Sequence, residues 1–462
     1  MPGLRECKAQ NNPQVSLYVY RSFEMNHKSF KDTFVIGFAI FAMFFGAGNL
    51  IFPPYLGLIA GRNWFLAFLC FMAVDIGLSL LALLVVAKIG KGAAGVTEKL
   101  GKLPSMLILS LNAICLGPLI AIPRTAATAY EFSVAPFFPK INAPVFSVIF
   151  FAVVILFCLK QSKVIDIIGT VFAPLILGAL IILIIKGIFM PLGTIDIAAS
   201  VQSAAEAGIG AGYQTMDVMA AMILSSSILI TLAQKSYTTK EQQFHMISRS
   251  GIIAAAILFI VYGGLAYLGA TVSGIYGPET DRVALLIAIT KALLGEKGMI
   301  LLGILVCAAC MTPAIGLLSS SASFFEKQTG NRISYRTFVF LFAGVSFLIS
   351  NFGISRILKL AAPILNMIYP VLILLVVLGM MSKWISYRII YRLSALSVIA
   401  VSTLTTLSEY LHIPFDIASL PLYQYGFQWI TPALLCGLLG LMIAERKHLL
   451  SPVFLGNVGI RA

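Results

Sequence analysis

The sequence predicts an all-α polytopic membrane protein with about 12 transmembrane helices, built as a five-plus-five inverted repeat plus two extra helices. Of its 462 residues, 59% are hydrophobic and only 11% are charged, a composition that argues against a soluble core. Apolar runs long enough to cross a bilayer recur along the whole chain. The first and the sixth run both contain clustered glycines, which is the pattern of two broken helices in corresponding positions of two repeats.

The expected spans divide the chain into five parts. The spans are roughly 33–59, 64–87, 106–134, 144–160, 165–187, 209–234, 250–273, 298–324, 335–352, 355–381, 391–409 and 428–445. The parts are a polar N-terminal segment (1–30), the first repeat (31–187), the second repeat (188–381), two further helices (382–447) and a tail (448–462). Residues 1–24 contain no apolar core of a signal peptide and precede a second plausible start at Met25, so we expect an extension rather than a functional domain.

The distribution of charge predicts the orientation of the chain. The formal net charge of +14 comes from 32 basic and 18 acidic residues, and in a soluble protein it would suggest a nucleic-acid partner. Most of the basic residues instead fall in loops on the same side as the N-terminus. The positive-inside rule then places both termini in the cytoplasm, with the lipid bilayer as partner and no nucleic acid.

The cysteines and histidines do not form a pattern typical of a metal centre or an embedded enzyme. Cys307 and Cys310 make a CxxC inside a hydrophobic run with no second pair, so we expect them to be packing residues. The four histidines fall in loops or near helix ends. No nucleophile–base pair is evident either, so we expect no catalytic residue and no cofactor apart from a coupling ion.

The first span contains residues that are expected to interrupt a helix near its middle. Gly46, Ala47, Gly48 and Asn49 place two weak helix formers and a side-chain amide there, and Pro53-Pro54 follows. A break inside hydrocarbon is tolerated where it faces protein or a water-filled cavity, because its backbone groups lack helical partners. The break therefore predicts a binding site, although the same residues also suit a kink for helix packing.

Two later spans carry ionisable residues. Asp75 lies in the second span and Arg124 in the third, and such groups usually face the bundle interior. Arg124 could pair with Asp75 or with Glu131, as a structural ion pair or as a gate. Both Arg124 and Asp75 are therefore candidates for gating or proton coupling.

The sixth span repeats the pattern of the first. We expect Gly208, Gly210 and Gly212 to interrupt the helix, with Asp217 following about a turn and a half later. Asp217 is a candidate proton carrier, and a helix-capping or packing role is the alternative. The eighth span has a polar flank with Thr312 and several serines, which suits either close helix packing or coordination of a hard cation.

These segments together resemble the bacterial branched-chain amino acid:cation symporter family (LIVCS, BrnQ-like), which belongs to the amino acid–polyamine–organocation superfamily with the LeuT-type fold. The matching stretches are AIFAMFFGAGNLIFPPYLG at 39–57, GPLIAIPRTA at 117–126, GYQTMD at 212–217, AACMTPAIGL at 308–317 and the ILNMIYP that ends at Pro370. They extend from the first span to the tenth, so the resemblance covers the membrane domain, and their combination is specific.

The resemblance implies a secondary transporter of the bacterial inner membrane that takes up leucine, isoleucine or valine with a cation, generally sodium. The substrate carboxylate would meet backbone amides of the first break, and carbonyls near Gly208 to Gly212 would meet its ammonium. The implied substrate-binding residues are Gly46, Ala47, Gly48, Asn49, Gly208, Gly210, Gly212, Tyr213 and Met216. Phe44, Phe45 and Met216 would wall the pocket for the apolar side chain, where one methylene changes binding by only about 1–3 kcal/mol.

The implied sodium site uses the main-chain carbonyls of Ala42, Phe45 and Ala309 and the hydroxyl of Thr312. A second hydroxyl residue is expected after the threonine, and this chain has Pro313 there. Proton coupling through Asp217 is therefore the alternative, as is uptake of another small neutral amino acid. A membrane enzyme, a receptor or a channel fits the sequence less well.

Overall fold

The computed structural model describes residues 30–160, 164–195, 199–411 and 419–449, and these residues form helices and connecting segments without a strand. The labelled helices are α2 (Ala47–Ala60), α3 (Trp64–Met72), α4 (Leu78–Ile89), α5 (Gly92–Thr97), α6 (Lys102–Ile114), α7 (Ala121–Ser133), α8 (Ala143–Lys160), α9 (Val164–Phe189), α10 (Ala204–Thr215), α11 (Asp217–Gln234), α12 (Lys240–Thr271), α13 (Arg282–Gln328), α14 (Tyr335–Ser350), α15 (Ile354–Met380), α16 (Arg388–Leu411) and α17 (Ile430–Leu449). A further helix, residues 30–44, precedes α2. The predicted extension 1–24, including Met25, lies outside the described residues.

Seven helical stretches in the described part of the chain are long and apolar enough to cross a membrane. Three more apolar helices there are shorter, at 143–159, 174–189 and 335–350. The prediction of a polytopic helical membrane protein is confirmed. The count of about 12 spans remains a prediction.

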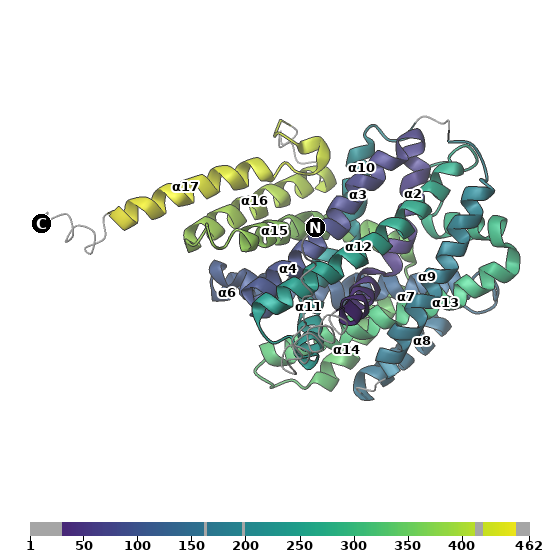
Figure 1. Ribbon diagram of the computed structural model, residues 1–462, viewed down its shortest axis with the longest axis horizontal. Coiled ribbons are helices and arrows are strands. Elements are labelled where there is room, and N and C mark those ends of the chain that lie inside the picture. Colours follow the sequence, from purple (N-terminus) through teal and green to yellow (C-terminus); the bar gives the residue numbers. More distant parts are fainter. Residues whose placement is uncertain (1–29, 161–163, 196–198, 412–418, 450–462) are drawn as a thin grey trace, which may run out of the picture.

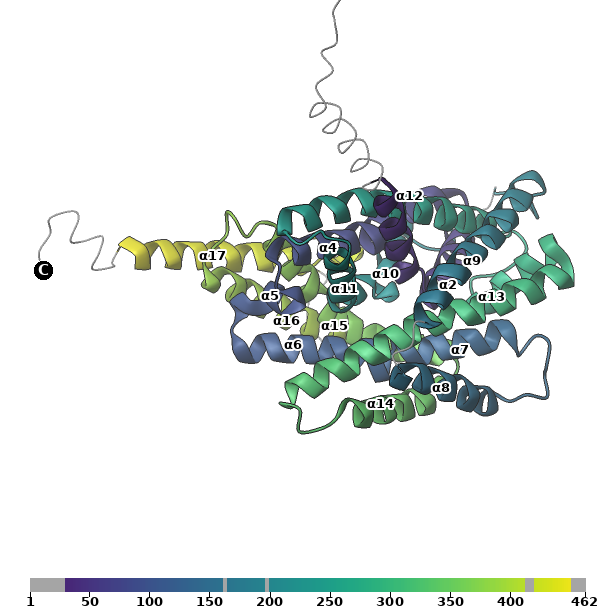
Figure 2. The ribbon, with the colours of Figure 1, turned by 60° about the horizontal axis from the view of Figure 1, so that its bottom comes forward.

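The helices pack as one bundle with an appended pair at one end (Figure 1). Helix α2 packs mainly against α12, and α13 packs mainly against α7. Helices α16 and α17 pack against each other, and α16 also packs against α15. Figure 2 shows α17 extending from this end beyond the rest of the bundle. Helices α16 and α17 therefore contact the rest of the bundle mainly through the packing of α16 on α15.

Close backbone approaches at two glycines join α2 to α12. A Cβ atom on Gly57 would lie 1.9 Å from the carbonyl oxygen of Ala266, and one on Gly269 would lie 1.8 Å from that of Pro54. No side chain larger than hydrogen fits at these points. Small residues let helices in lipid approach closely and gain van der Waals contact.

One helix begins earlier than its expected span, 250–273. Helix α12 begins at Lys240 because Thr239 and Gln242 form a capping box at its N-terminus. Hydropathy located the apolar middle of this helix and missed its polar first turns, which the cap marks. Helix α13 begins at Arg282, where the Asp281 side chain accepts hydrogen bonds from the backbone, but Gly295 is not helical (φ 70°, ψ −171°) and divides it, so the stretch after Gly295 begins close to the expected start at 298.

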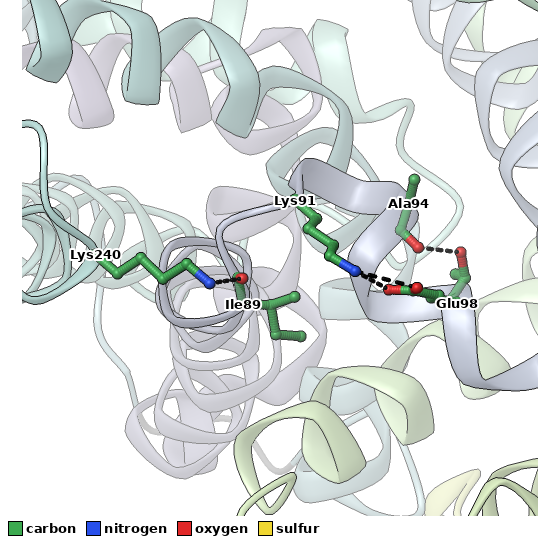
Figure 3. Close-up of polar contacts among 6 residues, drawn as sticks. Ile89, Lys91, Ala94, Glu98 and Lys240 are labelled. Atoms are coloured by element: carbon green, nitrogen blue, oxygen red, sulfur yellow. Dashed lines mark hydrogen bonds and ion pairs between the residues drawn. The ribbon is translucent and has the colours of Figure 1, made fainter.

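Polar contacts fix the connection that follows α4 (Figure 3). Gly90 ends α4 in the left-handed conformation (φ 74°), and the Lys240 ammonium donates to the carbonyl of Ile89 at 2.7 Å. The ammonium of Lys91 lies 2.9 Å from Glu98, where its hydrogen bond and charge lower the pKa of that carboxyl. The start of α12 is thus held against the end of α4.

We expect Gly269→Ala to lower the melting temperature of the purified protein, because the added methyl group would meet the Pro54 carbonyl. Overpacking of this kind destabilises by about 1–3 kcal/mol. Thermal unfolding in detergent measures the melting temperature. Gly344→Ala, in α14, is the matched control because no atom lies within 4 Å of its Cβ position. Equal melting temperatures for the two variants would contradict the close contact.

Candidate functional site

The chain is interrupted between the helix 30–44 and α2. Phe45 and Gly46 are not helical, and Gly46 is extended (φ −116°, ψ 179°) with no side chain capping α2. The first N–H groups of α2, at Ala47, Gly48 and Asn49, begin a helix and have no partner within it. The break therefore lies within one residue of the predicted Gly46–Asn49 stretch, and it presents helix-end donors to the bundle interior.

A second break separates α10 from α11 at one buried residue. Met216 adopts the left-handed conformation (φ 68°, ψ 20°), which costs a non-glycine residue about 1–2 kcal/mol. This corrects the expected interruption at Gly208, Gly210 and Gly212, because α10 runs through all three. The carbonyls expected to meet an ammonium there belong to a continuous helix.

The glycines of α10 serve close packing and a cavity instead. A Cβ atom on Gly208 would lie 2.1 Å from the carbonyl oxygen of Ala67 on α3, and one on Gly212 would lie 2.9 Å from the Cβ of Val74. Gly210 has no atom within 4 Å of its Cβ position and lines a cavity described below. Tyr213, the remaining predicted residue of α10, is buried.

Asn49 connects the two breaks directly. Its side-chain nitrogen Nδ2 donates to the carbonyl of Phe44 at 2.6 Å and to Oδ2 of Asp217 at 2.6 Å. Phe44 ends the helix 30–44, and Asp217 begins α11. The buried side-chain amide of Asn49 therefore donates hydrogen bonds to the end of one helix and to the start of another. Of the predicted site residues, Asn49 and Asp217 are therefore in direct contact across 168 positions of sequence.

Arg124 of α7 bonds the end of α10. Its Nη1 donates to the carbonyl of Gln214 at 2.6 Å, and its Nη2 donates to that of Thr215 at 3.1 Å. These carbonyls lie in the last turn of a helix, where intrahelical donors run out. The guanidinium also lies against Gly48, where a Cβ atom would be 2.8 Å from Nη2. Arg124 thus touches both breaks.

The expected ion pairs of Arg124 do not form in the described part of the chain. Glu131 instead accepts a hydrogen bond from the backbone N–H of Ile354 at 3.1 Å. Asp75 is an electrostatic neighbour of Arg124 and of Asp217, without an ion pair to the guanidinium. Arg124 is therefore a donor to main-chain carbonyls rather than half of a salt bridge.

Asp75 is buried in a π-helical turn, Ala73–Gly77, between α3 and α4. Its side chain is 0% exposed, and neither carboxylate oxygen has a hydrogen-bond partner among the described residues. Single π-turns inside helices occur frequently at functional sites. With Asp75 and Asp217 ionised and Arg124 protonated, this buried cluster carries one net negative charge, which a cation or a proton would neutralise.

Sequence reasoning missed two tyrosines of this cluster. The hydroxyl of Tyr369, on α15, accepts the N–H of Val218 at 3.3 Å in the first turn of α11. Tyr262, on α12, stacks on Phe45 with ring centroids 6.3 Å apart, and its buried hydroxyl has no partner in the described part of the chain. Tyr369 stands in the ILNMIYP stretch, which was noted without a role, and a lone tyrosine in an apolar run is the signal that could have found both.

The residues of the implied sodium site lie on the helix 30–44, at the first break and on α13. Phe45 is buried, while Ala42, Ala309 and Thr312 are half-buried. The Thr312 hydroxyl makes no hydrogen bond with the described residues. Pro313 has no N–H, so the carbonyl of Ala309 four residues earlier lacks its helical donor. Pro313 thus frees a carbonyl oxygen at the position where the resemblance expects one.

A cavity of about 520 Å³ lies between α2 and α10. Its lining includes Tyr55, Glu206, Gly210, Gln214 and Arg282. The Arg282 guanidinium lies 5.0 Å from the ring centroid of Phe52 and 4.8 Å from that of Tyr55. The volume suits a small organic molecule. Since Gln214 also bonds Arg124 through its carbonyl, the cavity reaches the neighbourhood of the second break.

The chain matches a family model described as branched-chain amino acid transport protein over residues 29–447. It is 33% identical over 427 residues to the branched-chain amino acid permease BraB of Bacillus subtilis (strain 168), covering 89% of this chain and 95% of that protein. It is 35% identical over 433 residues to a putative branched-chain amino acid carrier protein of Staphylococcus aureus (strain USA300), covering 89% and 96%.

Solved transporter structures share the fold at low sequence identity. The nucleobase-cation-symport-1 family transporter Mhp1 aligns with a TM-score of 0.59 at 15% identity, covering 90% of this chain and 93% of that one. A Na⁺-coupled sialic acid symporter aligns with a TM-score of 0.58 at 16% identity, covering 88% of each chain. The predicted LeuT-type fold is thereby confirmed.

We expect Arg124→Gln to destabilise the protein, because the carbonyls of Gln214 and Thr215 would lose charged donors inside the bundle. Leaving buried polar groups unpaired costs about 1–3 kcal/mol each. Thermal unfolding in detergent reports the loss. The exposed Arg336→Gln on α14 is the matched control and should unfold like the unaltered protein. An Arg124→Gln variant as stable as this control would show that the two bonds contribute nothing.

Proposed function

Because the chain belongs to the branched-chain amino acid transport protein family, we propose that it takes up leucine, isoleucine and valine by sodium symport. The observation that carries the proposal is the contact between the two helix breaks through Asn49 and Asp217. Broken helices at the interface of two repeats offer N–H groups and carbonyls to a zwitterion and its coupling ion. The chain is a membrane transporter by family and is not an enzyme.

The proposed position of the amino acid follows from the free backbone groups. Its carboxylate would accept from the N–H groups at the start of α2, near Ala47 and Gly48, where the helix dipole also favours an anion. Its ammonium would lie near Asp217, since Asn49 occupies the carbonyl of Phe44 and Arg124 occupies those of Gln214 and Thr215. The cavity between α2 and α10 would be the approach from outside.

The proposed sodium ion would lie between the first break and α13. Main-chain carbonyls and a threonine hydroxyl are the neutral oxygens that a hard monovalent cation prefers. The free hydroxyl of Thr312 and the Ala309 carbonyl freed by Pro313 support this placement. Position 313 has no hydroxyl to bind the ion. Pro313 instead leaves the Ala309 carbonyl without a helical hydrogen bond, so that oxygen can serve as a ligand in its place.

A second candidate is uptake of the same amino acids coupled to protons. The observation that favours it is the buried pair of carboxylates, Asp75 and Asp217, beside a single guanidinium. A proton shared by such a pair would neutralise the excess charge as a sodium ion would. In either case we propose the bacterial inner membrane with both termini cytoplasmic, as the basic loops predict.

We expect radiolabelled leucine to accumulate in proteoliposomes under an inward sodium gradient. Pro313→Ala should restore the N–H that bonds the Ala309 carbonyl and raise the sodium concentration for half-maximal uptake about tenfold. Ser319→Ala, on the same helix, is the matched control because its hydroxyl contacts the sulfur of Cys158 instead. Accumulation driven by a proton gradient alone would show that the coupling ion is the proton and not sodium. The absence of uptake under either gradient would overturn the substrate assignment.

We expect isoleucine and valine to compete with leucine at similar concentrations. The three side chains differ by at most one methylene, which changes binding in an apolar pocket by about 1–3 kcal/mol. Inhibition of labelled leucine uptake by each unlabelled amino acid measures this, with lysine as a charged control. Stronger inhibition by alanine or serine than by valine would indicate a transporter of other small neutral amino acids.

A further inference from the structure

A second cavity lies among α10, α15, α16 and the segment before α17, and it shares Glu206 and Gly210 with the cavity between α2 and α10. It has a volume of about 230 Å³. Its polar lining includes Ser402, Thr405, Thr406, Glu409, Gln428 and Glu206. Helices α15, α16 and α17 lie side by side at this end of the bundle (Figure 1). Its polar residues on α16 and before α17 have no role in the proposed transport mechanism.

Several lining residues have their donor groups bonded within the protein. The hydroxyl of Thr405 donates to the carbonyl of Val401 at 2.9 Å, and that of Thr406 donates to the carbonyl of Ser402 at 2.9 Å. The amide nitrogen of Gln428 donates to the Thr405 hydroxyl at 3.3 Å. Both threonine hydroxyl protons are therefore bonded within the protein, and the amide oxygen of Gln428 remains as an acceptor.

Three buried oxygens at the cavity have no partner among the described residues. They are Oγ of Ser402, Oε1 of Gln428 and the hydroxyl oxygen of Tyr213, on side chains that are 2%, 8% and 6% exposed. Buried polar atoms are nearly always hydrogen-bonded, so these positions point to a ligand. The Gln428 oxygen offers only lone pairs, and the two hydroxyl oxygens can offer lone pairs as well, so together they suit a ligand that accepts electron pairs.

The charge of the lining selects the same kind of ligand. Glu409 and Glu206 contribute carboxylates, and the lining contains no lysine, arginine or histidine. The hydroxyl of Tyr423 donates to Glu409 at 3.4 Å and leaves the other carboxylate oxygen available. The potential in the cavity therefore favours a cation and disfavours an anion.

We propose that this cavity is a second cation site, which binds a hard monovalent cation such as Na⁺. Ser402, Gln428 and Glu409 supply the ligands, with Thr405 beside them. Mostly neutral oxygens with few carboxylates suit a monovalent ion better than a divalent one. The volume exceeds that of a bare ion, so the ion keeps part of its water. The proposal goes beyond the proposed function and is independent of which ion drives transport.

Equilibrium binding of ²²Na⁺ to the purified full-length chain in detergent tests the site. All variants carry Thr312→Val, so that the sodium site proposed at α13 does not contribute. We expect Ser402→Ala and Glu409→Gln each to weaken the remaining Na⁺ binding about tenfold. Thr403→Val, on the same helix but not in the cavity lining, is the matched control and should bind like the Thr312→Val parent.

Three outcomes would overturn the proposal. One is Na⁺ binding that is equal in all variants, and another is no Na⁺ binding by the Thr312→Val parent. The third is displacement of the bound Na⁺ by excess leucine in the Thr312→Val parent, which would assign the cavity to the ammonium of the substrate. Because binding is read without uptake, failure of sodium-coupled transport and failure of this site remain distinguishable. A Na⁺-dependent rise in melting temperature that Ser402→Ala and Glu409→Gln lose is the second, independent measurement.

Discussion

The structure depends on the requirement that backbone polar groups inside a membrane find partners within the protein. An unpaired N–H or C=O group in hydrocarbon costs several kcal/mol, yet the described part of this chain interrupts helices in its interior, among them at Gly46 and at Met216. Arg124 and Asn49 meet this requirement, because their donors bond the carbonyls at the ends of α10 and of the helix 30–44. The amides that begin α2 have no side-chain cap.

The rest of the bundle holds these two breaks in register. Glycine contacts bring α2 onto α12 and α10 onto α3, so each broken helix packs closely on a neighbour along part of its length. The π-helical turn between α3 and α4 places Asp75 beside Asp217, and Tyr369 bonds the first turn of α11. Packing and polar contacts thus converge on the same few residues, which is how a binding site is kept in a fixed geometry.

Much of the fold could be predicted from the sequence, because hydropathy and glycine clusters are local signals. The first break was located within one residue, since Gly46 and Gly48 are poor helix formers. The second was misplaced because Gly208 and Gly212 are needed for packing on α3, while the break itself falls at Met216. A methionine in the left-handed conformation carries no sequence signal.

The site could be predicted less well, because its contacts join residues far apart in the chain. Asn49 and Asp217 were each singled out, but nothing in the sequence indicated that they touch. Arg124 was expected to meet a carboxylate and instead bonds two carbonyls, which depend on where α10 ends. Tyr262 and Tyr369 lie in apolar runs, and the sequence does not show which element each hydroxyl faces.

The charges of the site give a physical reason for coupling under the proposed function. A branched-chain amino acid is a zwitterion and brings no net charge to the cluster of Asp75, Asp217 and Arg124. With both carboxylates ionised, the occupied site would still hold one net negative charge away from water, which is unfavourable. A bound cation removes that charge, so substrate and cation would each bind more tightly in the presence of the other. The same reasoning applies to Na⁺ and to a proton, so under the proposed function the electrostatics of the site favour a bound cation without identifying it.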